Sequence, residues 1–161
     1  MDIPLDPNFL KKVRIYQTLK LNERKEKVIW KAELFLLKWA AGPNHQHTGD
    51  YIPKSTASDA LYSEIGDKKL SADKGLQACI GDIPKVFRAM VNDGFAEHNP
   101  QSENEIKINK NGLLMGKVLR EADTPFGKLL YFISSNTWWI IFFTSLIVNL
   151  SNLVNKFFPR K

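Results

Sequence analysis

The sequence predicts a mainly α-helical protein that carries one small two-stranded β hairpin and ends in a transmembrane helix. Three observations lead to this fold class. Apolar residues recur every three or four positions over most of the first 122 residues, which is the spacing of an amphipathic helix. Two short strand-like segments flank a polar turn between residues 95 and 109. A charge-free run covers residues 129–155.

The amino-terminal extension, residues 1–54, is expected to contain two helices, over residues 10–19 and 24–41. The second carries an apolar stripe formed by Val28, Ala32, Phe35 and Trp39, and Gly42-Pro43 ends it. Basic residues crowd this end of the chain: Lys11, Lys12, Arg14, Lys20, Arg24, Lys25 and Lys27. Such a cluster is compatible with contact to anionic lipid or nucleic acid, and equally with a solvated helix face.

Three helices are expected between residues 57 and 93. Thr56 and Asp59 have the spacing of a capping box, which predicts a helix over residues 57–65. A short helix from Ser71 follows, then a tight turn at Gly81-Asp82 and a helix over residues 83–93 with Asp82 as its cap. In this last helix one face is predicted to be buried: Ile83, Val86, Phe87, Met90 and Val91. The opposite face is Lys85, Arg88, Ala89 and Asn92.

A hairpin and one more helix complete this part of the chain. Residues 95–98 and 105–109 are predicted as two strands, joined by the polar turn 99–104. Asn111 is positioned to cap a final helix that runs to Ala122. Its inward residues are predicted to be Leu114, Val118 and Leu119.

This order of elements resembles the winged helix-turn-helix superfamily over about residues 57–122. The resemblance is carried by Leu70-Ser71-Ala72, Val86-x-Arg88, Asp93-Gly94-Phe95 and Ile106-x-Ile108 leading to Gly112 and Gly116. It implies a winged-helix-like domain over residues 55–123, mainly α with a two-stranded wing. From their own patterns, two helices are expected before this domain and one transmembrane helix after it. The helix over residues 83–93 is about one turn shorter than is usual in DNA-binding members, which is a departure from the family.

If the domain binds DNA, the resemblance implies which side chains make contact. Lys85, Arg88 and Asn92 would meet bases or phosphate, and Lys107 and Lys110 of the wing would meet the backbone. The alternative is that these residues are the solvated polar face of an ordinary amphipathic helix.

The carboxyl-terminal run from Leu129 to Asn155 has 27 residues without a charge, and a helix needs about 20 apolar residues to cross a bilayer. We place a juxtamembrane linker at residues 124–136, the transmembrane helix at 137–155 and a short basic tail at 156–161. Residues expected at the two membrane interfaces are Trp138 and Trp139 on one side and Lys156, Arg160 and Lys161 on the other. A buried core helix of a soluble protein is the alternative.

Three polar residues in this segment share one helical face: Ser145, Asn149 and Asn152. Interhelical hydrogen bonds between such residues favour self-association of the helix in a membrane. The alternative is that the two asparagines lie near the lipid headgroups and contact water.

The composition bounds the chemistry. The formal net charge of +6 is divided equally between residues 1–128 and the three basic residues that follow. Cys79 is the single cysteine, which excludes an intrachain disulfide and favours a buried structural thiol. His45 and His47, even with Asp50 nearby, are weak evidence for a metal site, because no further ligand stands at a suitable spacing. The sequence carries no phosphate-binding glycine loop and no hydrolase signature, so we expect no enzyme activity, cofactor or metal.

We therefore expect a non-enzymatic, single-pass, tail-anchored membrane protein that presents its amino-terminal domain to the cytoplasm. Two functions are compatible with the sequence. In the first, the domain is a membrane-tethered regulator that binds duplex DNA. In the second, the domain binds a protein or a ligand, and the membrane helix acts as the effector and self-associates. The expected partners are accordingly the lipid bilayer, DNA or a cytoplasmic protein, and a second copy of the chain.

Overall fold

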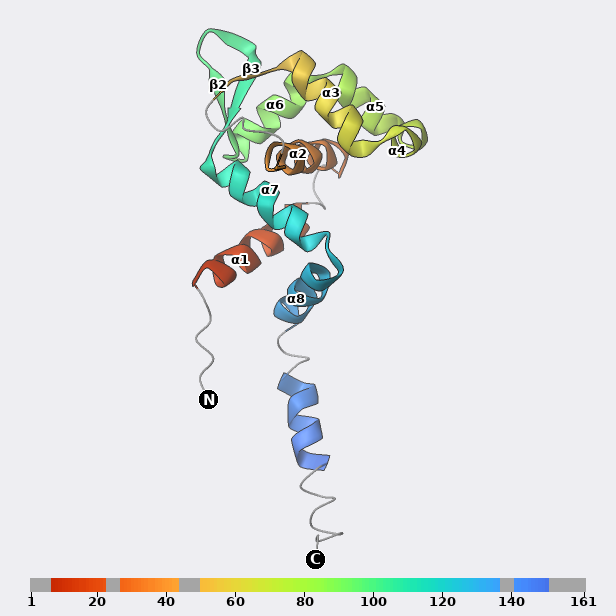
Figure 1. Cartoon of the computed structure of the whole chain (residues 1–161), viewed down its shortest axis with the longest axis vertical. Coiled ribbons are helices and arrows are strands. Elements are labelled where there is room, and N and C mark those ends of the chain that lie inside the picture. The colour runs from red at the N-terminus through yellow and green to blue at the C-terminus, as the bar shows by residue number, and fades with distance from the viewer. Residues whose placement is uncertain (1–6, 23–26, 44–49, 137–140, 151–161) are drawn as a thin grey trace, which may run out of the picture.

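The structure is a computed structural model, and it describes residues 7–22, 27–43, 50–136 and 141–150. Its helices and strands follow one another along the chain as shown in Figure 1. The first half contains α1 (Pro7–Asn22), α2 (Lys27–Ala40), β1 (Ile52–Pro53), α3 (Lys54–Ile65), α4 (Asp67–Ala72) and α5 (Lys74–Gly81). The second half contains α6 (Ile83–Asn92), β2 (Ala96–Asn99), β3 (Ser102–Ile108), α7 (Lys110–Ala122) and α8 (Pro125–Ser135). Residues 141–150 are also helical.

Helix α2 lies at the centre of the fold and contacts α3, α5, α6 and α7. Its side chains Trp30, Leu36 and Leu37 are buried among these helices, as are Phe87 and Met90 of α6. The Trp30 indole Nε1 donates a hydrogen bond to the Leu19 carbonyl oxygen at 3.2 Å, which satisfies its polar atom inside the core. The predicted stripe of α2 is confirmed in part, because Ala32 and Trp39 are buried whereas Val28 and Phe35 are half-buried.

The described sheet has three antiparallel strands in the order β1-β3-β2. Ile106 of β3 lies between Ile52 of β1 and His98 of β2. The prediction of a two-stranded hairpin is correct for β2 and β3 but omits β1. A two-residue strand that ends in Pro53 has no alternating pattern, so nothing in its sequence distinguishes it from a loop.

Two glycines set how closely α7 approaches the core. A Cβ atom at Gly116 would overlap the Leu37 carbonyl of α2, and one at Gly112 would overlap the Phe95 carbonyl. Both positions are buried. The Gly112-x-x-x-Gly116 spacing therefore allows α7 to lie against the backbone of α2 and of the loop before β2.

Three predicted helix starts differ from the structure. Helix α3 begins at Lys54 and has no side-chain cap among the described residues, so the Thr56–Asp59 capping box is not formed. Asn109, and not Asn111, caps α7 by accepting hydrogen bonds from the Asn111 and Gly112 amides. Asp73 caps α5 in the same way, and its insertion between α4 and α5 divides the short helix predicted from Ser71.

A second, smaller core joins α1, α7 and α8. It consists of Val13, Val118, Ala122 and Tyr131. The Tyr131 ring stacks on Tyr16 with 4.4 Å between the ring centroids, and Lys12 forms an ion pair with Glu121 at 2.9 Å. Residues 124–136, predicted as a linker, thus contain a helix that packs on the rest of the protein.

The prediction of a transmembrane helix over residues 137–155 is wrong. No helix within the described residues is long and apolar enough to cross a membrane. Helix α8 is separate from the helix at 141–150, since α8 ends at Ser135. Three further predictions depend on the transmembrane helix and are wrong with it. They are the fold class with a terminal membrane helix, the tail-anchored function and the single-pass membrane localisation.

All five residues assigned to the membrane interfaces lie outside the described part of the chain. These are Trp138, Trp139, Lys156, Arg160 and Lys161, and Asn152 of the polar stripe is also outside. Ser145 and Asn149 lie in the described helix, where both are exposed.

Candidate functional site

Helices α5 and α6 are joined by one residue, Asp82. Its backbone amide donates to the Ala78 and Cys79 carbonyl oxygens, which closes the last turn of α5. Helix α6 then starts at Ile83, and Pro84 in its first turn needs no intrahelical donor. The Asp82 side chain makes no capping bond to the described backbone, so the predicted cap residue is in the right place without the predicted bond. This junction is tighter than the three- or four-residue turn of a common helix-turn-helix.

The two faces of α6 follow the predicted pattern, except that Ala89, predicted on the outward face, is half-buried. Ile83, Val86, Phe87 and Met90 are buried, and Val91 is half-buried. Lys85, Arg88 and Asn92 are exposed. Helix α6 ends at Asn92, and Gly94 just after it has a φ of 74°, a left-handed conformation that favours glycine.

The exposed cations of α6 form no ion pair with a described residue, as is also true of Lys68 and Lys69 on α4. Lys12, Lys31 and Lys38 each form an ion pair with a carboxylate of another element. Lys85 and Arg88 form no ion pair and no side-chain hydrogen bond with any described residue. Their charges are therefore available to an external partner.

Lys107 and Lys110 of the hairpin lie together but apart from the α6 cations. Lys107 stands opposite Glu97 in the β2–β3 register, and Lys110 is exposed at the start of α7. Both line one surface depression with Glu97 and Asn111. Lys85 and Arg88 do not line this depression, so the predicted nucleic-acid residues do not all share one surface feature.

Residues of α1 that the sequence did not connect with this region lie beside the end of α6. Lys11 and Arg14 line a cavity of about 350 Å³ together with Asp93 and Asn111. The basic run at the amino end was evident in the sequence, but its position next to Asp93 depends on the packing of α1 against α7.

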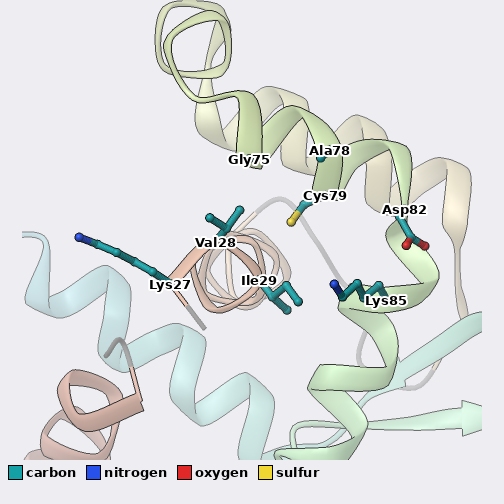
Figure 2. Close-up of a pocket in the computed structure, with 8 residues that line it drawn as sticks. All are labelled: Lys27, Val28, Ile29, Gly75, Ala78, Cys79, Asp82 and Lys85. Carbon is teal, nitrogen blue, oxygen red and sulfur yellow. The ribbon is translucent and has the colours of Figure 1, made fainter. Parts of the chain in front are cut away.

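A cavity of about 410 Å³ opens where the starts of α2 and α6 meet α5 (Figure 2). Its lining residues are Lys27, Val28, Ile29, Gly75, Ala78, Cys79, Asp82 and Lys85. In Figure 2 the Lys85 side chain extends toward Ile29, whereas the Lys27 amino group points away from the other labelled residues. The cavity therefore combines an aliphatic wall with one inward-facing ammonium group.

The Cys79 thiol forms part of this cavity and is 8% exposed. Burial raises the pKa of the Cys79 thiol; Lys85 opposes that change, and Asp82 and Asp73 add to it. The neutral thiol is therefore favoured, which is unlike the depressed pKa of a nucleophilic cysteine. Cys79 acts here as a small apolar wall residue.

Metal binding has no candidate among the described residues, which contain no cluster of three or more His, Cys, Asp or Glu side chains able to hold an ion. His45 and His47 lie outside the described ranges. Comparison with known protein families, with curated proteins and with solved structures finds no match.

Proposed function

We propose that this chain is a winged helix-turn-helix protein that binds duplex DNA through α6, with the β2–β3 hairpin as its wing. Support comes from the order of elements, in which α5 and α6 precede a hairpin whose strands continue a sheet of order β1-β3-β2. It also comes from the packing of α6 against α2 and β2, which holds its polar face outward.

The observation that carries this proposal is the exposed polar face of α6. Lys85, Arg88 and Asn92 are spaced at i, i+3 and i+7, so they lie along one side of the helix. Arginine and lysine are suited to the guanine edge or to phosphate, and asparagine to adenine. An α-helix with its side chains has a diameter of about 10–12 Å, which fits the major groove of about 12 Å.

Charge outside α6 also bears on the affinity. Between Asp50 and Asn136 the chain has eleven basic and twelve acidic residues, so this part has no positive excess. Helix α1 has four basic residues and no acidic ones. Lys11 and Arg14 of α1 lie close to Asp93 and offset its repulsion of phosphate at the end of α6. DNA binding is therefore expected to need α1 as well as α6.

Fluorescence anisotropy of the full chain with a labelled duplex of about 30 base pairs tests the proposal. We expect saturable binding at 50 mM salt that weakens steeply toward 200 mM, as counterion release requires. The double substitution Lys85→Glu and Arg88→Glu should abolish binding at either salt concentration.

The matched control is Lys68→Glu with Lys69→Glu. These lysines are exposed on α4, which lies away from α6 in Figure 1, and the substitutions change the net charge by the same amount. Binding should be weakened only slightly. An equal loss in both double variants would mean that net charge alone holds the DNA, and no binding at 50 mM salt would overturn the proposal.

A further inference from the structure

We infer that the cavity between α2, α5 and α6 is a binding site for a small amphipathic anion, such as an aromatic carboxylate or sulfonate. The charged group would meet the Lys85 ammonium. The apolar body would lie on Val28, Ile29 and the Cys79 thiol.

Size and lining support a small organic ligand. A volume of about 410 Å³ falls in the range of small-molecule sites, which are mostly apolar and have a few polar groups that fix orientation. Val28, Ile29, Ala78 and Cys79 offer no strong hydrogen-bonding group to the interior of the cavity. An apolar body is therefore preferred there over a sugar or another polyhydroxylated molecule.

Charge specifies the other end of the ligand. Of the two lining lysines, Lys85 is the one directed into the cavity, since the Lys27 amino group points away from the other lining residues in Figure 2; Asp82 is the one lining carboxylate, and it forms no ion pair with Lys85. Lys85 has no ion-pair partner among the described residues, and Figure 2 shows its side chain directed to the aliphatic wall beside Ile29. An anion in the cavity would give the Lys85 ammonium a charged partner, whereas a cation would be repelled by it.

The end of the cavity distant from Lys85 is fixed in place. The Asp73 carboxylate caps α5 and also pairs with Lys31 of α2 at 3.5 Å. At Gly75 a Cβ atom would lie 3.0 Å from both γ carbons of Val28, so α5 and α2 are in close contact there. These contacts hold α2 and α5 together without a ligand, as in a largely pre-formed site.

Occupancy would regulate DNA binding, a step that rests on the proposed function. Lys85 belongs both to the cavity and to the exposed face of α6. An anion bound to its ammonium group competes with a DNA phosphate for the same charge, so ligand and DNA are expected to weaken each other reciprocally.

The ligand test uses 8-anilinonaphthalene-1-sulfonate and its neutral analogue N-phenyl-1-naphthylamine on the full chain without DNA. Cys79 is the single cysteine, so protection of the thiol from N-ethylmaleimide reports occupancy of this cavity alone. We expect the sulfonate to protect Cys79 in a saturable way. Lys85→Met should weaken binding of the sulfonate about tenfold, the loss expected for a charge-assisted hydrogen bond, and leave the neutral analogue unchanged.

Two further variants keep the result interpretable. Ala78→Phe places a large side chain at an exposed position on the cavity wall and should remove protection by both probes. Phe126→Ser with Phe132→Ser removes exposed apolar side chains of α8 and should leave the protection of Cys79 unaltered. Sulfonate fluorescence without protection of Cys79, or equal loss of both probes in Lys85→Met, would overturn the inference.

Adding DNA separates this inference from the proposed function. Protection of Cys79 in a protein that binds no DNA would support the cavity and overturn the DNA proposal. DNA binding that is unaffected by saturating sulfonate would overturn the competition for Lys85.

Discussion

Similar apolar side chains are buried in the core around α2 and exposed in the carboxyl-terminal helices. In α6, Val86, Phe87 and Met90 have no exposed surface. In α8, Phe126 is 71% exposed and Phe132 is 62% exposed. The helix at 141–150 likewise exposes its large apolar side chains, with Ile147 at 65%. Apolar content thus does not decide burial; the number of elements that pack around a helix does.

Helix α8 itself shows where this difference arises. Its Tyr131 is buried against Tyr16, and Gly127 lies against the Glu121 carbonyl. Four other large apolar side chains of α8 are exposed: Phe126, Leu129, Phe132 and Ile133. Since α6 is enclosed by α2, α3, α5 and the sheet, substitutions should affect the two regions very differently.

The largest difference is expected for one truncation made in each region. Phe87→Ala should lower the free energy of unfolding by about 3–5 kcal/mol, because it leaves a cavity in a fully packed core. Phe132→Ala should change the free energy of unfolding by less than about 0.5 kcal/mol, because its side chain is mostly exposed. Urea unfolding followed by circular dichroism measures both. Similar losses would show that α8 is covered in solution.

The contrast between α6 and α8 also explains what the sequence could and could not predict. The two faces of α6 are predicted correctly except at Ala89 and Val91, since Ile83, Phe87 and Met90 follow the helical period and strongly polar residues stand between them. In residues 129–150 no charged residue divides one helical face from another. The pattern therefore indicates an apolar segment but does not predict which of its side chains are buried. That is why a membrane helix was predicted and the stacking of Tyr131 on Tyr16 was not.

The candidate site, too, could be predicted only where it depends on the pattern within a single helix. The exposure of Lys85, Arg88 and Asn92 follows from the local period of one helix. The cavity does not, because it requires Val28 of α2 to meet Gly75 of α5, and no local pattern specifies contacts between segments so distant in sequence. The strand β1 was missed for a related reason, since its two residues are strand only through pairing with β3.

A smaller effect is expected from a single added methyl group where α7 meets α2. Gly116→Ala should lower the free energy of unfolding by about 1–3 kcal/mol, because the new Cβ atom overlaps the Leu37 carbonyl. Gly81→Ala is the matched control, since no described atom lies within 4 Å of a Cβ atom at this helical position. It should be neutral or stabilise by up to about 1 kcal/mol. Thermal unfolding of both variants measures the difference. Equal destabilisation of the two would contradict the prediction.

The stability that the buried Tyr131 of α8 contributes should fall at alkaline pH. Burial raises the pKa of Tyr131 to about 12 from 10.0, and the charge of Glu121 and the nearby Tyr16 add to this. Because the folded protein disfavours the tyrosinate, this contribution to stability is complete below pH 10 and is lost as the pH rises toward 12. The difference in unfolding free energy between the parent protein and Tyr131→Phe should therefore shift against the parent only above pH 10. A constant difference from pH 9 to 12 would contradict the buried position of this hydroxyl.

The smallest effect is expected where the carboxyl-terminal region is most apolar and least packed. Replacing Phe126 and Phe132 by serine removes two side chains that are mostly exposed, so the free energy of unfolding should change by less than about 0.5 kcal/mol. The matched pair in the core, Phe87→Ser and Val86→Ser, should prevent folding, since both positions are fully buried. Chemical denaturation at two protein concentrations measures the exposed pair. A loss above 1 kcal/mol that grows with protein concentration would mean that a second copy covers α8, and the contrast between the two regions would then hold only for the single chain.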